Sequence, residues 1–282
     1  MRLFFMLVRR VPPVPSPVLV EAFELLSRRG FRVESGIAEE LLVRPDRLPA
    51  EHDLYVLKSH TELSLSLAAV LDTQGARMLN PYRCCAATQD KIVVARRLHA
   101  AGVSAPRSWV TGDFSLLRSL LDETPLIVKP HRGHRGAGIT VVRKTSELAS
   151  LTPTVAPMLV QEYVEGSGED LKVYVVGEQV FAVRKPFSES SFTVAGKPAA
   201  VTSELRETAL ACGRVLGLGL YGLDLVESRD GPLVVDVNYF PGYKGVPGVA
   251  PLIADYIEDY ANGSECLSLP ELDALVQPVG PL

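Results

Sequence analysis

The pattern of hydrophobic residues changes along the chain, and this change constrains the fold more than any other feature. Strand-like and helix-like runs alternate over the first third, beginning with a strand candidate at 3–8 and a helix candidate at 19–26. Such alternation predicts a small parallel sheet with helices on its faces. After residue 125 strand patterns dominate, and helices are expected only at 203–216 and 249–260. We therefore expect an α+β protein.

The remaining elements divide the chain into three parts. Thr88 is expected to cap a helix that ends at Gly102, and this helix begins a new unit. The further strand candidates are 53–57, 76–79, 125–129, 139–142, 158–164, 171–176, 179–184, 221–227 and 233–238, with a helix at 61–71. The expected parts are an N-terminal α/β domain at 1–85, a central subdomain at 86–165 and a C-terminal subdomain at 166–282.

Composition and charge exclude several classes of protein. The chain is 47% hydrophobic and 22% charged, which excludes disorder, collagen and coiled coil. Its net charge of −4 argues against a protein that coats nucleic acid, although a local basic cleft could still hold an anion. The longest uncharged stretch, 148–161, has 14 residues and two prolines, too few to span a bilayer. Four cysteines without paired spacing suit a reducing compartment. We expect a cytoplasmic monomer or homodimer without nucleic-acid or membrane partners.

A lysine followed by a glycine-rich loop is the first motif that bears on chemistry. Lys129 ends an apolar strand, and the loop 131–138 leads into another strand. The loop glycines are Gly133, Gly136 and Gly138. This arrangement places a cation beside backbone N–H groups that can approach an anion, so it predicts a phosphate clamp. It is neither a Walker loop nor a dinucleotide fingerprint, because no Gly-Lys-Ser/Thr occurs and a strand follows instead of a helix. An ordinary hairpin with a surface lysine is the alternative.

The second motif is an apolar strand that breaks into a polar stretch at 161–164. Its edge could offer backbone groups to an adenine base, and a carboxylate of Glu169 or Asp170 could then reach the ribose hydroxyls. An exposed acidic loop would have the same sequence pattern.

The third motif carries the strongest signal and lies on a predicted hairpin. Asp236 and Asn238 are two residues apart on one strand, so they point to the same face, and Asp224 on the partner strand can join them. Two carboxylates and an amide oxygen are hard ligands suited to Mg²⁺ that is also bound by nucleotide phosphates. Buried aspartates satisfied by backbone amides are the alternative, but isolated buried carboxylates are costly.

These three segments in this order resemble the ATP-grasp superfamily over essentially the whole chain. The resemblance implies that two antiparallel sheets hold ATP behind an N-terminal α/β domain. It also implies roles for particular residues. Lys91 and Lys129 would contact phosphates, and Asp224, Asp236 and Asn238 would bind Mg²⁺. The adenine hinge would comprise Gln161, Glu162, Tyr163 and Val164, and the ribose would be held by Glu169 or Asp170.

Two branches of the superfamily compete. Residues 236–243, together with 57–61 and 171–177, are similar to the inositol trisphosphate 5/6-kinase branch. That similarity implies a place near substrate or nucleotide phosphates for Lys58, Lys172, Lys185 and Gly242, with His60 and Lys244 beside them on the acceptor side. The kinase branch carries a histidine late in the glycine loop, for which only His131 and His134 could substitute here.

The loop 133–138 instead resembles the ribosomal-protein glutamate ligases and their carboxylate-amine ligase relatives. That branch usually has an arginine-x-asparagine stretch and paired glycines after the strand that ends here at Arg184, whereas this chain reads Lys-Pro-Phe-Ser-Glu-Ser-Ser-Phe from residue 185. A ligase needs cations to stabilise an acyl phosphate. Arg184 and Lys185 could still supply them.

We therefore expect an ATP- and Mg-dependent enzyme that transfers the γ-phosphoryl of ATP, with Lys172, Lys185 and Arg184 as catalytic cations. The preferred acceptor is a small anionic molecule, a hydroxyl of a phosphorylated polyol, and the alternative is a carboxylate-amine ligase. Arg9, just past the first strand, is expected at the acceptor pocket, although a solvated basic turn would look the same. A non-catalytic nucleotide-binding module is the third hypothesis, and the intact set of metal ligands speaks against it.

Overall fold

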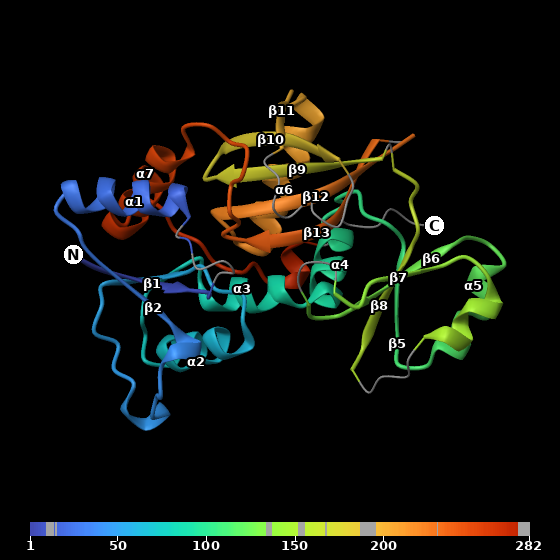
Figure 1. The fold of residues 1–282 in the computed structure, drawn as a ribbon, viewed down its shortest axis with the longest axis horizontal. Coiled ribbons are helices and arrows are strands. Elements are labelled where there is room, and N and C mark those ends of the chain that lie inside the picture. The colour runs from blue at the N-terminus through green and yellow to red at the C-terminus, as the bar shows by residue number, and fades with distance from the viewer. Residues whose placement is uncertain are drawn as a thin grey trace.

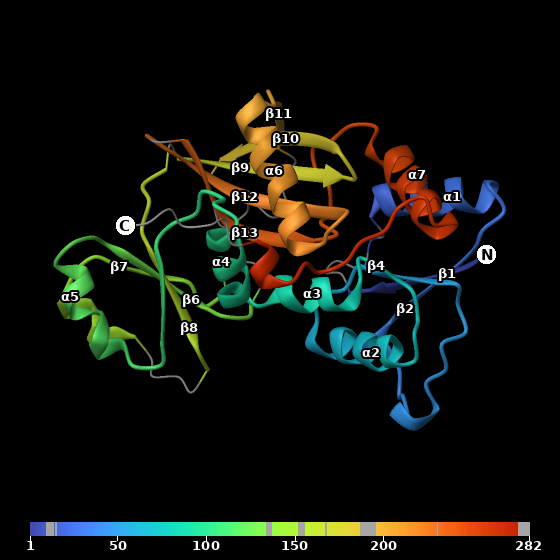
Figure 2. The same ribbon diagram turned by 180° about the vertical axis from the view of Figure 1, so that it is seen from behind.

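The computed structural model arranges the chain in three sheets (Figures 1 and 2). It describes residues 1–9, 14, 16–133, 137–151, 156–166, 168–186, 196–229 and 231–275. The combination of one parallel and two antiparallel sheets with packed helices confirms the expected α+β class.

The first sheet is parallel and has the strand order β2-β1-β3-β4. Its strands are β1 (Arg2–Leu7), β2 (Arg32–Ile37), β3 (Leu54–Leu57) and β4 (Met78–Leu79). Helices α1 (Pro17–Arg28) and α7 (Val249–Asn262) cover one face, where Phe5 and Val56 pack, and α2 (Glu62–Thr73) covers the other, where Met6 and Leu57 pack. The last helix of the chain therefore packs against the first sheet (Figure 1). Arg29, directly after α1, forms an ion pair with Asp255 of α7 at 2.5 Å.

The second sheet is antiparallel, with the order β5-β8-β6-β7. Its strands are β5 (Ser108–Thr111), β6 (Leu126–Pro130), β7 (Thr140–Val142) and β8 (Met158–Glu162). Two helices, α3 (Tyr82–Gln89) and α4 (Lys91–Ala100), connect it to the first sheet. One face packs on α5 (Arg118–Leu121) through Val128, Val160 and Leu121. Because strand residues alternate between faces, Lys129 and Gln161 lie on the opposite face.

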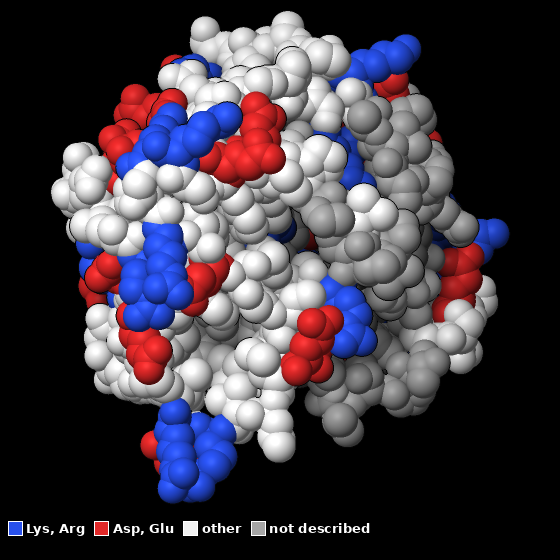
Figure 3. Space-filling model, turned by 60° about the vertical axis from the view of Figure 1, so that its left-hand side comes forward, with Lys and Arg blue, Asp and Glu red and all other residues white. Residues whose placement is uncertain are grey.

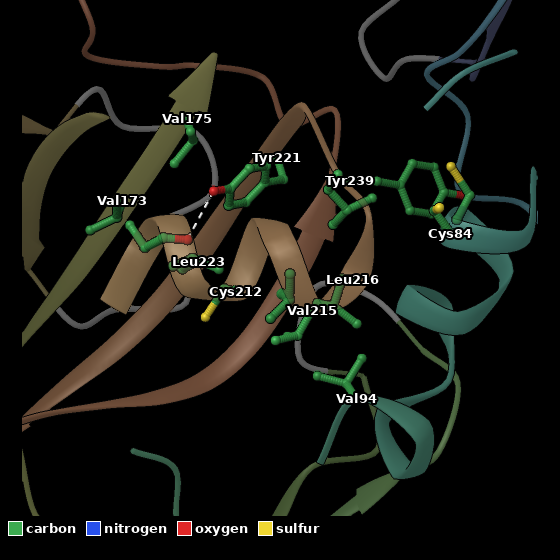
Figure 4. Close-up of a cluster of buried hydrophobic side chains, with 14 of the residues drawn as sticks. Cys84, Val94, Val173, Val175, Cys212, Val215, Leu216, Tyr221, Leu223 and Tyr239 are labelled. Atoms are coloured by element: carbon green, nitrogen blue, oxygen red, sulfur yellow. Dashed lines mark hydrogen bonds between the residues drawn. The ribbon is translucent and has the colours of Figure 1, made fainter. Parts of the chain in front are cut away.

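The third sheet is also antiparallel, with the order β11-β10-β9-β12-β13. Its strands are β9 (Glu169–Val176), β10 (Gln179–Pro186), β11 (Lys197–Ala199), β12 (Leu220–Ser228) and β13 (Gly231–Tyr239). Helix α6 (Ser203–Leu216) packs on one face against Val173, Val175 and Leu223 (Figure 4). Tyr221 Oη donates a hydrogen bond to the carbonyl of Ala209 in this helix at 2.8 Å. The face away from α6 is the one that carries the candidate site, and it is called the cleft face below.

The elements predicted from periodicity are present, with local differences. β2, α3, β5, α5 and β11 are additional. Thr88 does not cap α4, because it lies inside α3 and donates to the carbonyl of Cys84 at 2.7 Å. Asp90 caps α4 instead, since its carboxylate accepts from the backbone N–H of Ile92 at 3.0 Å. Short 3-10 helices occur at Ala38–Glu40, Pro45–Arg47, Phe114–Leu117, Thr145–Ser150 and Leu272–Ala274. No helix in the described part of the chain has the length and apolar character needed to cross a membrane.

Candidate active site

The register of the third sheet brings the predicted metal ligands together. Asp224 on β12 lies directly opposite Asp236 on β13, and Lys172 on β9 lies directly opposite Asp224. Asn238 follows Asp236 by two residues and therefore shares its face. A row of charged side chains thus crosses the cleft face from β13 to β9.

Two lysines neutralise the two aspartates. Lys172 Nζ donates to Asp224 Oδ1 at 2.7 Å, and Lys91 Nζ donates to Asp236 Oδ1 at 2.7 Å. Burial works to lower the pKa of Lys172, but Asp224, Asp170 and Asp236 outweigh this effect and raise it. Lys172 therefore stays charged. Lys91 is the first residue of α4, so its contact reaches from the central part of the chain to the third sheet.

Lys129 makes a second contact across the cleft. Its side chain is buried, and Nζ donates to Gln161 Oε1 at 2.8 Å and to the carbonyl of Val235 at 3.2 Å. Burial lowers the pKa of Lys129, while Asp236 acts in the opposite direction. The predicted phosphate lysine therefore lies between the second sheet and the metal-ligand strand. The side chain of Gln161 is engaged with this lysine.

A buried lysine and an acidic residue extend the cluster on the cleft face. Lys185 on β10 is 2% exposed and lies opposite Asp170 on β9. Burial lowers the pKa of Lys185, and the neighbouring cations Lys172 and Lys244 lower it further. Burial raises the pKa of Asp170, against the effect of Lys172 and Lys185. Lys129, Lys172 and Lys185 thus concentrate positive charge near Asp224. Burial acts to lower the pKa of each of these lysines, and the Asp224 carboxylate acts in the opposite direction.

Two residues expected at the site point away from it. Arg184 forms a bidentate ion pair with Glu227 at 2.5 and 2.7 Å, and its guanidinium lies 3.9 Å from Glu169. Because neighbouring residues of a strand face opposite sides, Arg184 and Lys185 cannot both reach the cleft. The structure thus separates Arg184 from Lys172 and Lys185, with which it was expected to act. For the same reason Asp170, and not Glu169, is the carboxylate on the cleft face.

The predicted adenine hinge lies at the end of β8. The backbone N–H groups of Glu162 and Tyr163 donate to the carbonyls of Arg107 at 3.0 Å and of Pro125 at 2.8 Å. The Glu162 carboxylate accepts from Arg107 Nε at 3.0 Å, and the Tyr163 ring lies 5.1 Å from the guanidinium of Arg143. Val164 follows the strand. The contact of this stretch with adenine stays a prediction.

The glycine loop connects β6 to β7, as expected. Gly138 has φ +73°, and a Cβ atom there would lie 2.8 Å from Pro130 Cγ, so the backbone requires glycine at this position. Gly133 is exposed at the other end of the loop. His134 and Gly136, both expected to contact the nucleotide, lie outside the described residues. The carbonyl of His131 accepts from the backbone N–H of Lys91 at 2.9 Å, which joins the loop to α4.

Residues expected to bind the acceptor lie where the chain leaves β3 and β13. The ring of His60 stacks on Tyr239 at 4.1 Å, and the ammonium of Lys58 lies 5.4 Å from the ring of Phe240. Tyr239 Oη donates to the carbonyl of Ser59 at 2.9 Å. The loop 58–60 is therefore bound to the residues that directly follow Asn238.

The other residues expected to bind the acceptor, Gly242, Lys244 and Arg9, lie in two different places. Gly242 and Lys244 lie in the turn after β13, and Lys244 is close enough to Lys185 to affect its pKa, which burial and the Lys172 charge also lower. Arg9 is exposed and pairs with Glu40 at 3.2 Å. A space-filling view shows a hollow near the centre of one face, with basic and acidic atoms deep inside it (Figure 3).

Comparison with known proteins places the chain in a family. A family model described as a RimK-like ATP-grasp domain matches residues 88–253, which include every member of the cleft-face cluster. The chain belongs to the RimK-like ATP-grasp family. It is 35% identical over 207 residues to a probable alpha-L-glutamate ligase of Xanthomonas axonopodis pv. citri, and this match covers 68% of the chain and 70% of the relative. A probable alpha-L-glutamate ligase 1 of Hahella chejuensis is 32% identical over 210 residues, 66% of the chain and 68% of the relative.

Solved structures agree on the ATP-grasp fold. A RimK domain protein from Sphaerobacter thermophilus matches with a TM-score of 0.73 and 19% identity, over 91% of this chain and 99% of that one. D-cycloserine synthetase DcsG matches with a TM-score of 0.72 and 19% identity, over 93% and 100% of the two chains. The ATP-grasp fold expected from the sequence is confirmed.

The family decides between the two chemistries that the sequence left in competition. The RimK-like relatives are named as ligases, and nothing in these comparisons supports an inositol phosphate kinase. The preference for the kinase branch, which rested on residues 236–243 together with 57–61 and 171–177, is therefore replaced by the ligase alternative. The chain is an ATP-grasp enzyme of the ATP-dependent ligase class.

Sequence reasoning missed two contributions to the site of this RimK-like enzyme. Ser108 accepts from Gln161 Nε2 at 3.1 Å, and no sequence signal distinguishes this serine from an ordinary strand residue. Tyr239 and Phe240 hold the loop 58–60, and their position directly after Asn238 is a signal that could have identified them.

Proposed function

We propose that this RimK-like enzyme is an ATP- and Mg²⁺-dependent carboxylate-amine ligase. It would phosphorylate an acceptor carboxylate and join the acyl phosphate to an amine. The observation that carries the proposal is the cleft-face cluster of Asp224, Asp236, Asn238, Lys172 and Lys185, which the family match spans completely. The identity to probable alpha-L-glutamate ligases supports an α-amino acid as the amine, and glutamate is the first candidate.

The donor set suits Mg²⁺ when nucleotide phosphates share the ion. Asp224 and Asp236 face each other in register, and in the structure Lys172 and Lys91 compensate these like charges. Their carboxylates and the Asn238 amide are hard oxygen donors. In the proposed site, phosphate oxygens of the nucleotide would complete the coordination of the ion. Bound Mg²⁺ would neutralise charge on the transferring phosphoryl group.

The residues of the chain would do the remaining work through positioning and charge. Phosphoryl transfer requires alignment and neutralisation more than covalent participation of the protein, so no protein nucleophile is needed. Lys91, Lys129 and the glycine loop would hold the phosphates of ATP. Lys172 and Lys185 would stabilise the acyl phosphate and the oxyanion that forms when the amine attacks. Asp170, the carboxylate on the cleft face, would hold the ribose.

The acceptor is proposed to be a small anionic molecule whose carboxylate enters beside the loop 58–60. Lys58, His60 and Lys244 supply positive or hydrogen-bonding groups at this end of the cluster, and Gly242 leaves space for a substrate. Arg9 would act only at the rim. The chain as a whole is acidic, so this local concentration of cations favours an anionic acceptor.

Isotope transfer tests the proposed reaction directly. L-Glutamate and a panel of amino acids and dicarboxylates are prepared with ¹⁸O in their carboxylates and incubated with ATP, Mg²⁺ and the enzyme. A ligase transfers one ¹⁸O to inorganic phosphate, and hydroxylamine traps the acyl phosphate as a hydroxamate. A kinase gives ADP and a stable phosphorylated acceptor, and it releases no inorganic phosphate. Stable phosphorylation of a polyol without label transfer would overturn the proposal.

A further inference from the structure

Lys129 is held by two strands that belong to different sheets. Its ammonium donates to the Gln161 side chain on β8 at 2.8 Å and to the Val235 carbonyl on β13 at 3.2 Å. β8 leads into the expected adenine hinge, and β13 carries Asp236 and Asn238. One buried cation therefore connects the strand expected to bind the base with the strand expected to bind the metal.

The contact with β13 depends on an irregularity in that strand. Asp224 pairs with Asp236 and Leu225 pairs with Val234, so the register skips Val235. This is a β-bulge, in which the extra residue is left out of the ladder and its backbone groups are redirected. The freed carbonyl of Val235 accepts from Lys129.

The contact with β8 depends on the orientation of one amide. An ammonium only donates, so the Gln161 atom that faces Lys129 must be the carbonyl oxygen. The amide nitrogen then faces Ser108 Oγ, to which it donates at 3.1 Å. Ser108 Oγ in turn donates to the carbonyl of Pro106 at 2.9 Å, so it is available as an acceptor. Ser108 thereby fixes the amide in the orientation that Lys129 requires.

We propose that Gln161 is a positioning residue that acts through Lys129, together with the bulge at Val235. An ammonium has three N–H donors, and these two acceptors use two of them, which leaves the third to bind a nucleotide phosphate. Gln161 thus sets the position of a phosphate relative to the base. The inference rests on the proposed function in one respect, because it requires Lys129 to bind a phosphate of ATP.

Nucleotide affinities measured by calorimetry, without turnover, test this role. Gln161→Met keeps the length of the side chain but removes the acceptor, so we expect ATP to bind roughly tenfold more weakly. Adenosine, which lacks phosphates, should bind within about twofold of wild type, because the base is expected to bind backbone groups of the hinge and not the Gln161 side chain. Gln74→Met is the control for the same substitution away from the cleft, where Gln74 Nε2 donates to the carbonyls of Leu48 at 2.8 Å and Val70 at 3.4 Å.

Two further variants make the test independent of folding problems. Ser108→Ala removes only the hydroxyl that orients the amide, and it should weaken ATP binding in the same direction by a smaller factor. In a Lys129→Met background, Gln161→Met should produce no additional loss, because the two residues act as one unit.

The outcomes separate this inference from the proposed function. Equal losses for ATP and adenosine, or additive losses in the double variant, would mean that Gln161 does not act through Lys129 and would overturn the inference alone. If Lys129→Met itself leaves ATP affinity unchanged, Lys129 is not a phosphate ligand, and both the inference and that part of the proposed site fail.

Discussion

Arg184 and Lys185 are neighbours in sequence on opposite faces of β10, so substituting them should have different effects on activity and stability. Lys185→Met removes a cation that is 2% exposed on the cleft face. Removing one preorganised donor from a site that stabilises developing charge typically lowers kcat about 100- to 1,000-fold, or about 2.7–4 kcal/mol. Lys172 and Lys244 remain close by, so we expect the lower end of this range.

The matched variant Arg184→Met should show the opposite pattern. It breaks the ion pair with Glu227, in which the two side chains are 37% and 38% exposed. Such an exposed pair contributes at most about 1 kcal/mol to stability. We therefore expect a small decrease in the free energy of unfolding and kcat within about twofold of wild type.

Lys185→Met should not destabilise the protein. Burial and the neighbouring cations lower the pKa of Lys185, which means that the folded state disfavours its charge. A depressed lysine pKa opposes folding at pH values below that pKa, and the opposition fades as the pH rises toward the unfolded value. The variant should therefore match or exceed wild-type stability at neutral pH.

Acceptor-dependent ADP release gives kcat, and urea unfolding followed by circular dichroism gives the free energy of unfolding. Both variants are measured under the same conditions. The reasoning is refuted if Arg184→Met loses as much activity as Lys185→Met, or if Lys185→Met retains wild-type kcat.

Three further predictions address the metal ligands, the glycine loop and the acceptor. Asp236→Asn should lower Mg²⁺-dependent ATP turnover by roughly two orders of magnitude while the circular dichroism spectrum stays unchanged, because a charged ligand is lost; turnover near wild type would exclude this metal site. Gly138→Ala should cost about 1–2 kcal/mol in urea unfolding and raise the KM for ATP, since φ is +73° and Pro130 occupies the Cβ position; an unchanged unfolding midpoint would show that the loop relaxes. Lys58→Ala should raise the acceptor KM and reduce its salt dependence, with ATP affinity nearly unchanged; unchanged acceptor kinetics would place the acceptor elsewhere.

Much of the fold could be predicted because the relevant signals are local. The periodicities over 203–216 and 249–260 correspond to α6 and α7, and the hairpin over residues 229–231 corresponds to β12 and β13. Thr88 was the wrong cap because two candidate capping residues lie close together. Helix α3 ends at Gln89, and Asp90 has the extended backbone conformation that an N-cap of α4 requires.

The expectation that Arg184 and Lys185 act together shows what the local sequence could not predict, namely which of the two side chains faces the cleft. Each residue has the correct charge for stabilising an acyl phosphate, and the sequence signal is the same for both. Only the register of β9 and β10 decides which one faces the cleft, and a shift of one residue would exchange them.

The sequence by itself determined the α+β class, the order of the segments expected to bind phosphate, adenine and metal, and the common face of Asp236 and Asn238. These properties depend on chain order and on the two-residue period of a strand, and both can be read without knowing what packs where. The tertiary structure alone decided which partners meet: Lys91 with Asp236, Lys172 with Asp224, and Lys129 with the carbonyl of Val235. Those contacts join residues 52 to 145 positions apart, and strand register, a β-bulge and the packing of one sheet against another select them. Such choices depend on the free energy of the whole fold, which no local pattern encodes.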